Sequence, residues 1–319
     1  MKTFTLFWLA TVLLLFRSTA GEPFKIRFVT DWYPQPEHGG YYHALVNGYY
    51  SAAGLDVQII PGGPSVFAVQ RVATGAADIG MLNTDGILIA NDHNIPTVAI
   101  LATFQHDPQG IMLHAEDRVQ DWPDLDGRTI AMTPGNPWFP FLARKYHLKK
   151  AREIPLTYSV AAFLKDPTFI QQIFVTSEPF FVQQAGVKPR VMLLSDAGFD
   201  PYRVSFTTPQ MIRDHSKEVR GFVEASVRGW RDYLANPKSA HAQIQKLNPE
   251  LTPERMGFSY QALRDGHFIE GKPDKGESIG GFLESRWQFQ FNLLKEVGVI
   301  DGKFPLTNAW TGTFCNGVR

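Results

Sequence analysis

The sequence predicts an α/β fold of two lobes that enclose a cleft. Strand-like and helical segments alternate from residue 24 to residue 104, and the alternation starts again after Asp107-Pro108. The chain has 319 residues, which is too many for one ordinary compact core and comfortable for two lobes. Strands that alternate with helices of this length form parallel βαβ units. We therefore expect each lobe to be built on parallel strands.

The first half of the chain alternates clearly. Residues 24–30 alternate in polarity and are rich in β-forming side chains, which predicts a strand. Gly54 is placed to end a helix in the usual C-cap manner. The predicted elements are a loop at 31–40, helices at 41–53, 65–75 and 85–91, and strands at 55–60, 77–81 and 97–104.

The second half repeats the pattern and then becomes mainly helical. Thr176-Ser177-Glu178-Pro179 is typical of a helix start, with a hydroxyl cap, an acid and an early Pro. The other predictions are strands at 127–132, 170–175 and 204–207, a loop at 133–137, and helices at 138–146 and 219–234. Residues 24–105 and 205–319 should form lobe 1, and residues 110–202 should form lobe 2, with crossings near 104–111 and 202–207.

Residues 1–20 have the pattern of a signal peptide. Lys2 precedes an apolar run at 4–16, and Ser18-Thr19-Ala20 offers small residues for cleavage after Ala20. The run is shorter than the roughly 20 apolar residues that span a bilayer. Arg17 directly after the run leaves an uncleaved membrane anchor as the alternative. We expect export to a bacterial periplasm.

The composition argues against several classes of partner. Lys plus Arg and Asp plus Glu each total 31, so no net field attracts nucleic acid or an anionic surface. The single cysteine, Cys315, excludes an internal disulfide and a cysteine-based metal site. We expect a monomer whose partner is a small-molecule ligand.

The stretch DWYPQPEHGGYYHALVNGYY, from Asp31 to Tyr50, suggests a binding role. In open parallel sheets, ligands bind beyond the carboxyl ends of the strands, and the loop at 31–40 follows the first strand. Its aromatic side chains offer flat apolar faces with polar tips that can stack on a planar ring. Gly39 and Gly40 would let backbone N–H groups approach a ligand closely.

The segments DWYPQPEH and GYYSAAGLDV resemble the SsuA/THI5-like (NMT1) family of solute-binding proteins. GAADIG at 75–80 and TSEPF at 176–180 match the same family. The resemblance is strong over 26–103, fair to residue 202 and thin after 209. It implies a type II periplasmic binding protein that closes like a hinged clamp and delivers its ligand to the membrane permease of an ABC transporter.

The opening motif is similar to that of the branch that binds pyrimidine precursors of thiamine. Other branches take sulfonates, nitrate or bicarbonate, and a sensor role is a further alternative.

The resemblance places Trp32 and His38 of the opening motif on the wall of lobe 1, and Tyr42 on the following helix is a further candidate. Trp32 would stack on the ligand, and His38 would form a hydrogen bond to the ligand or at the hinge. Tyr42 would also face the ligand. The structural alternatives are a packing role for Trp32, a helix cap for His38 and a core position for Tyr42.

Two further loops of lobe 1 are expected at the cleft. Gly63 and Ser65 follow the second strand, where backbone N–H groups could hold a carboxylate, a sulfonate or a ring oxygen. The alternative is a plain turn in which Ser65 caps the next helix. Asn83 and Thr84 follow the third strand at the same level.

Lobe 2 should contribute the loop at 133–138 and the start of a helix. Gly135 and Asn136 lie in this loop, and the Asn136 amide could pair with a heterocycle edge because it carries both a donor and an acceptor. Trp138 could cover the second face of the ring. Glu178 would accept a hydrogen bond from an exocyclic amine, or would only complement its helix dipole. A sulfonate is the less favoured cargo because the loop lacks an Arg or Lys to compensate its charge.

An enzymatic role is not expected. A fungal branch of the family synthesises the thiamine pyrimidine with a Lys, a His, iron and a cysteine-rich segment. Asn83 stands where that Lys would be and Ile87 where that His would be, and no cysteine cluster is present. The motifs of serine hydrolases, zinc proteases and P-loop proteins are also missing. We therefore predict no catalytic residue, no cofactor and no metal site.

Overall fold

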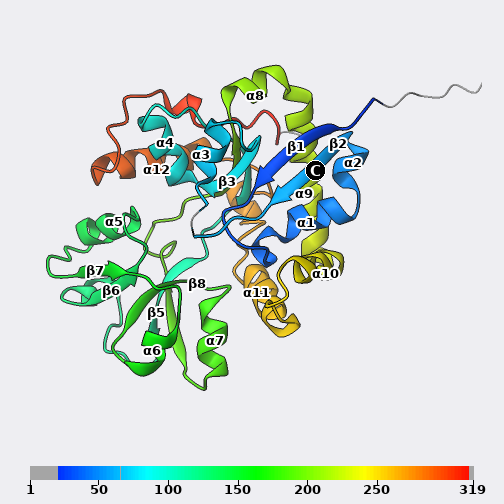
Figure 1. The fold of residues 1–319 in the computed structure, drawn as a ribbon. Coiled ribbons are helices and arrows are strands. Elements are labelled where there is room, and N and C mark those ends of the chain that lie inside the picture. Colours follow the sequence, from blue (N-terminus) through cyan, green and yellow to red (C-terminus); the bar gives the residue numbers. More distant parts are fainter. Residues whose placement is uncertain (1–20, 65, 316–319) are drawn as a thin grey trace, which may run out of the picture.

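The computed structural model describes residues 21–64 and 66–315, and it has two five-stranded sheets, each covered by helices (Figure 1). The predicted leader at 1–20 and the predicted site residue Ser65 lie outside the described residues. Within the described ranges, no helix is long and apolar enough to cross a membrane.

The first sheet has the strand order β2-β1-β3-β10-β4. Its strands are β1 (Phe24–Val29), β2 (Leu55–Ile60), β3 (Ile79–Asn83), β4 (Val98–Phe104) and β10 (Arg203–Thr207). The helices in this half are η1 (Pro36–His38), α1 (Gly39–Val46), α2 (Tyr49–Ala52), α3 (Ala68–Ala73), α4 (Thr84–Asp92), α8 (Pro209–Asp214), α9 (Ser216–Ala235), α10 (Lys238–Leu247), α11 (Pro253–Asp265), η3 (Pro273–Lys275), α12 (Glu284–Glu296) and η4 (Leu306–Asn308).

The second sheet has the order β7-β6-β8-β5-β9 and lies below the first sheet in Figure 1. Its strands are β5 (Gln109–His114), β6 (Thr129–Met132), β7 (Arg152–Pro155), β8 (Ile170–Phe174) and β9 (Pro189–Leu193). The helices around it are η2 (Trp122–Leu125), α5 (Trp138–Lys145), α6 (Ala161–Lys165) and α7 (Glu178–Gln184).

The sheets are mixed, whereas the sequence predicts parallel strands only. β10 runs antiparallel to both of its neighbours in the first sheet, and β5 does the same in the second. β5 is the first strand after the chain crosses from the first sheet to the second, and β10 is the first strand after it returns. β5, β7 and β9 are absent from the sequence-based prediction, because β7 and β9 are short edge strands that contain Pro and charged residues.

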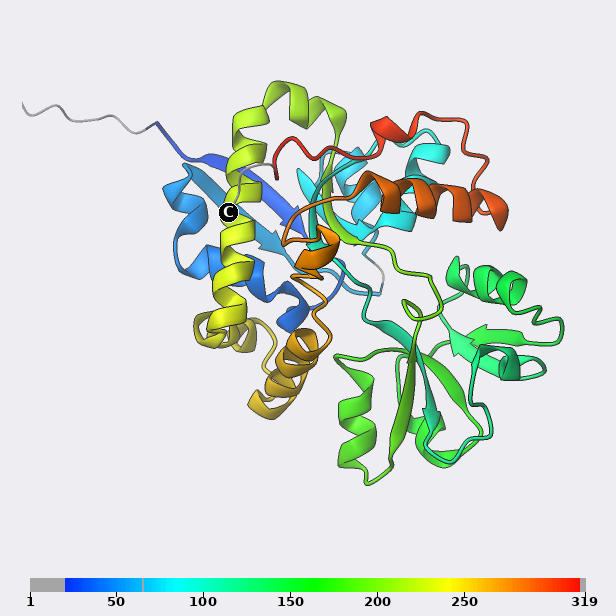
Figure 2. The same ribbon diagram turned by 180° about the vertical axis from the view of Figure 1, so that it is seen from behind.

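The glycines and tyrosines of the opening motif pack the core of the first lobe. A Cβ atom on Gly40 would lie 2.2 Å from the Trp230 ring, so glycine is required where α1 crosses α9. Tyr41 and Tyr42 are fully buried, and the Tyr41 hydroxyl bonds the Ser205 hydroxyl at 2.6 Å. The expectation that this glycine pair approaches a ligand is therefore wrong: it serves helix packing. Figure 2 shows α9 along the side of this lobe.

A charged cluster ties the two crossings to the C-terminal part of the chain. The His106 ring lies 2.7 Å from Asp200 and 3.0 Å from Glu277. Arg286 contacts the same two carboxylates at 3.2 and 3.4 Å. His106 and Asp200 lie on the two connections. Glu277 precedes α12 and Arg286 lies in the first turn of α12, so the cluster joins both connections to the C-terminal part of the chain.

Candidate ligand-binding site

A cavity of about 700 Å³ lies between the two sheets and is lined by residues of both lobes. It occurs at this place because the parallel strands of each sheet end there. The antiparallel strands begin at the same edges: Arg203 pairs with Asn83 and Phe104, and Gln109 pairs with Phe174. Strand ends and strand starts therefore converge on one site.

A charged pair lies at the edge of the first sheet. Arg203 forms an ion pair with Asp31, and its guanidinium stacks 5.1 Å from the Phe174 ring centroid. Burial lowers the pKa of Arg203 to about 10. The Asp31 carboxylate also bonds Nε2 of His38 at 2.8 Å. Burial lowers the pKa of His38 to about 4, so the neutral ring donates Nε2–H and orients Asp31.

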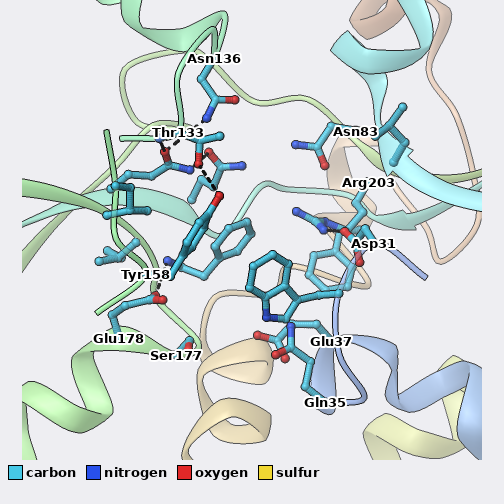
Figure 3. Close-up of a pocket in the computed structure, with 18 of the residues that line it drawn as sticks. Asp31, Gln35, Glu37, Asn83, Thr133, Asn136, Tyr158, Ser177, Glu178 and Arg203 are labelled. Atoms are coloured by element: carbon cyan, nitrogen blue, oxygen red, sulfur yellow. Dashed lines mark hydrogen bonds and ion pairs between the residues drawn. The ribbon is translucent and has the colours of Figure 1, made fainter. Parts of the chain in front are cut away.

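A second group of charges includes Glu37 of lobe 1 and Glu178 of lobe 2, which line the same end of the cavity from different sides (Figure 3). Thr176 donates to Oε1 of Glu37 at 2.5 Å, and the backbone N–H of Phe174 donates to Glu178 at 2.8 Å. Burial raises the pKa of both carboxyl groups. Arg255 lies close enough to oppose both shifts electrostatically.

The upper part of the lobe 2 wall is uncharged and rich in amides. The Gln172 side chain accepts from the Thr133 backbone at 2.9 Å and from the Asn136 amide at 3.3 Å. Its own amide donates to Gln109 at 3.3 Å. Figure 3 shows Thr133 and Asn136 at the opposite end of this wall from Ser177 and Glu178. A chain of amides thus offers donors and acceptors to a planar polar edge.

Aromatic rings from both lobes contact each other in the lining of the cavity. The Trp32 and Tyr158 ring centroids are 5.5 Å apart at an interplanar angle of 43°. Tyr158 is half-exposed and adopts a left-handed backbone conformation with φ 56°. Non-glycine residues in that conformation occur mainly where the surrounding structure holds them. The two rings form an aromatic slot, and we use this name for Trp32 and Tyr158 below.

Four residues predicted from the sequence line this cavity, namely Trp32, Asn83, Asn136 and Glu178. They come from the loop after β1, the end of β3, the loop after β6 and the start of α7, so the structure brings both lobes' predictions together. Asn83 is the N-cap residue of α4 but makes no side-chain cap bond, which leaves its amide free for a ligand. Their roles as ligand contacts stay predictions.

His38 and Tyr42 do not line the cavity. His38 is fully buried and acts on the site only through Asp31. Tyr42 lies on the face of α1 that packs into the first lobe, where it belongs to the hydrophobic core. A regular helix presents only one side to the cleft, and the side with Tyr42 faces the interior.

Gly63, Thr84, Gly135 and Trp138 also lie away from the cavity lining. Gly63 is buried beside the Tyr33 ring, and Thr84 donates its hydroxyl hydrogen to the Tyr202 carbonyl at 3.1 Å. Gly135 is an exposed turn residue with φ 78°. Trp138 is buried in the lobe 2 core next to Phe139, because the first turn of α5 faces inward.

Several lining residues were not predicted from the sequence. Arg203 and Gln109 start antiparallel strands, and the βαβ pattern gives no reason to place them at a ligand site. Tyr158 lies in a loop after β7, which was itself missed. Glu37 is part of the quoted motif, and an acid between Pro36 and His38 was the available signal.

Within the described part of the chain, no group of three or more His, Cys, Asp or Glu residues is arranged so that it could hold a metal ion. Ile87, which the family resemblance aligns with the fungal His, is fully buried. Asn83, which the resemblance aligns with the fungal Lys, lines the cavity.

Comparison with known proteins identifies the class of protein and then its family. The fold is that of periplasmic binding proteins: the aliphatic sulphonate binding protein SsuA from Escherichia coli superposes with a TM-score of 0.68 at 14% identity, covering 91% of this chain and 93% of SsuA. The NMT1/THI5 like family model matches residues 35–240, more than half of the sequence. The chain therefore belongs to the NMT1/THI5-like family, and both the expected family and the expected fold class are confirmed.

Curated relatives include binding proteins and enzymes. The riboflavin-binding protein RibY of Chloroflexus aurantiacus is 23% identical over 305 residues, covering 92% of this chain and 86% of RibY. The formylaminopyrimidine-binding protein of Halalkalibacterium halodurans is 30% identical over 113 residues, covering 35% of this chain and 34% of that protein. The pyrimidine phosphate synthase THI5 of Saccharomyces cerevisiae is 27% identical over 108 residues, covering 33% and 32% of the two chains. The binding-protein relatives thus support small-ligand binding by this chain.

Proposed function

We propose that the protein binds a flat heteroaromatic solute outside the cytoplasm, closes its lobes on it, and presents it to the permease of an ABC importer. The observation that carries this proposal is the aromatic slot, in which each lobe provides one ring. The protein would act as a monomer after cleavage of its leader behind Ala20, and it would carry out no chemistry on its ligand.

The aromatic slot explains how a ligand would drive closure. Non-bonded carbon atoms pack at about 3.5–4.0 Å, so a planar ring between two others holds them roughly 7 Å apart. The Trp32 and Tyr158 centroids are 5.5 Å apart, which leaves no room for such a ring. The slot must therefore open to admit the ligand and close again on both of its faces. Because each face is contacted by a different lobe, binding stabilises the closed state.

We propose a flavin as the preferred ligand. The cavity of about 700 Å³ falls in the middle of the range of roughly 300–1,000 Å³ for small-molecule sites, and it exceeds what a single pyrimidine ring fills. RibY, which matches most of the chain, is named as a riboflavin-binding protein. The carbonyl and imide edge of the flavin ring alternates acceptors and a donor. The amides of Asn83 and Asn136 and the Arg203 guanidinium are suited to such an edge.

A thiamine-type aminopyrimidine is the second candidate. Glu178 lines the cavity and could accept from its exocyclic amine. The relative named for formylaminopyrimidine shares 30% identity with a third of the chain. The same relatives leave a sulfonate less favoured, and the cavity charges agree: Arg203 is paired with Asp31, and Arg255 faces Glu37 and Glu178.

Thermal unfolding of the purified mature chain with a ligand panel tests this proposal. The panel contains riboflavin, formylaminopyrimidine, hydroxymethylpyrimidine, an alkanesulfonate and nitrate. A ligand at one hundred times its Kd stabilises the folded state by about 2.7 kcal/mol. We expect riboflavin to raise the melting temperature most and to bind with 1:1 stoichiometry. Stabilisation by the alkanesulfonate or nitrate alone would refute the heteroaromatic assignment, and turnover of the bound compound would refute the binding-protein role.

A further inference from the structure

One end of the cavity has hydrogen-bonding groups that the protein does not use. Oε2 of Glu37 and Nε of Arg255 are buried, and neither has a partner in residues 21–64 and 66–315. Both residues line the cavity, and Glu37 is only 4% exposed. A buried polar group without a hydrogen-bond partner is destabilising, so this end of the site is incomplete without a ligand.

The two groups are held in place by their neighbours. Glu37 is anchored through its other oxygen, which accepts from Thr176 at 2.5 Å. Arg255, on α11, lies over the Phe181 ring at 4.6 Å and contacts the Ser177 hydroxyl at 3.4 Å. In the described structure it makes no ion pair within 4.0 Å to either glutamate. Burial raises the pKa of Glu37 and lowers that of Arg255, as expected for charges with incomplete compensation.

The chemistry of these groups selects one kind of ligand group. Glu37 presents an acceptor and Arg255 a donor, and a hydroxyl is a neutral group that can donate to the one and accept from the other through a single oxygen atom. An ammonium only donates, and a phosphate only accepts and would meet the like charges of Glu37 and Glu178. Ser177 adds a further hydroxyl beside Glu178 (Figure 3).

We propose that Glu37 and Arg255, with Ser177, form a subsite for the hydroxylated side chain of the ligand. This subsite rests on the proposed function, in which the ring of the ligand occupies the aromatic slot. The aromatic slot recognises the flat ring of the ligand, and the subsite distinguishes ligands by the substituent on that ring.

Three flavins that share one ring system test the subsite. Lumiflavin has a methyl group where riboflavin has its polyhydroxylated side chain, and flavin mononucleotide ends that side chain in a phosphate. Dissociation constants are measured by quenching of flavin fluorescence. A hydrogen bond to a charged group contributes about 1.5–3 kcal/mol, or roughly a factor of 10 to 150. We expect the wild type to bind riboflavin at least tenfold more tightly than lumiflavin, and flavin mononucleotide more weakly than riboflavin.

Variants at the subsite give the second readout. Glu37→Gln and Arg255→Met should each reduce the lumiflavin-to-riboflavin ratio of dissociation constants toward one. Glu254→Gln, an exposed neighbour on α11, is the matched control and should leave this ratio unchanged. Circular dichroism and thermal melting verify that each variant is folded. A variant that does not fold is replaced by Ser177→Ala, for which we expect a smaller change in the same direction.

The outcomes separate the two proposals. If lumiflavin binds the wild type as tightly as riboflavin, or if Glu37→Gln weakens both equally, the subsite is wrong and the ring assignment stands. If neither riboflavin nor lumiflavin binds, the flavin assignment and the subsite both fail.

Discussion

The two walls of the cavity differ in charge. Lobe 1 contributes five of the six charged residues that line it in the described structure, and lobe 2 contributes Glu178 together with amides and hydroxyls. The first wall is organised before a ligand arrives, because Asp31 is held by both Arg203 and His38. The amides of Asn136 and Gln172 can each present a donor or an acceptor. We therefore propose that lobe 1 fixes the orientation of the ligand, whereas lobe 2 adapts to it on closure.

The largest expected effect comes from removing the cation of the lobe 1 wall. Arg203→Met leaves Asp31 unpaired, since His38 is neutral, and breaking a buried ion pair from one side costs about 3–5 kcal/mol. We expect the free energy of unfolding, measured by urea denaturation, to fall by this order. The double variant Asp31→Asn/Arg203→Met should recover most of the loss. A single variant as stable as the wild type would show that the pair is not an organised part of this wall.

The next effect concerns the aromatic slot. Trp32→Ala should weaken ligand binding by about 2–4 kcal/mol, or roughly 30- to 1,000-fold, because buried aromatic anchors dominate binding energy. Trp32 is partly exposed, so the melting temperature without ligand should change little. Calorimetric titration gives the affinity.

Trp122 supplies the matched control for this comparison. It is buried in lobe 2, away from the cavity, and stacks on Tyr146. Trp122→Ala should lower stability by about 3–5 kcal/mol and leave the affinity of the folded protein unchanged. The reverse pattern, with affinity lost at Trp122 and kept at Trp32, would remove the aromatic slot from the site.

The sequence predicted the lobes and part of the site because both follow from local patterns. Trp32, Asn83 and Asn136 directly follow or end parallel strands, so alternation alone places them at the cleft. Arg203 and Gln109 start antiparallel strands, and strand direction is set by long-range pairing that a local pattern does not contain.

The predictions that placed Tyr42 and Trp138 at the ligand were wrong for the same reason. Tyr42 and Trp138 are aromatic and lie within a few residues of loops that line the cavity. The direction of a side chain on its helix nevertheless decides whether it faces the core or the ligand, and both of these side chains are buried. The same motif that marks the family serves two purposes: Trp32 faces the cavity, while Gly40 and Tyr41 join α1 to α9 and to the sheet.

A smaller effect is expected at Asp85 on the lobe 1 wall. Burial raises the pKa of Asp85 from 3.8 to about 6, and one of its oxygens lacks a partner in the described residues. The stabilising contribution of the protonated group is present below pH 3.8 and is lost as the pH rises through about 6. Asp85→Asn should therefore stabilise the protein above that pH by about 1–3 kcal/mol.

Thermal melts of wild type and Asp85→Asn across pH 4 to 8 check this prediction. A pKa shift of one unit corresponds to about 1.4 kcal/mol of stability. The difference between the two proteins should grow with pH and then level off. A difference that shrinks with rising pH would mean that Asp85 is stabilised as a carboxylate.

The smallest effect is expected on the lobe 2 wall. Asn136→Ala removes one adaptable amide, and Gln172 keeps its bonds to the Thr133 backbone and to Gln109. We expect a loss of about 1 kcal/mol in binding, or roughly fivefold, by calorimetric titration. A loss as large as that of Trp32→Ala would show that lobe 2 orients the ligand and would reverse the comparison.

A crystal structure of the mature chain with riboflavin tests the central claim most directly. The account predicts the flavin ring between the Trp32 and Tyr158 side chains, in contact with both lobes. A ring bound against one lobe only, or outside the space between these two side chains, would contradict it.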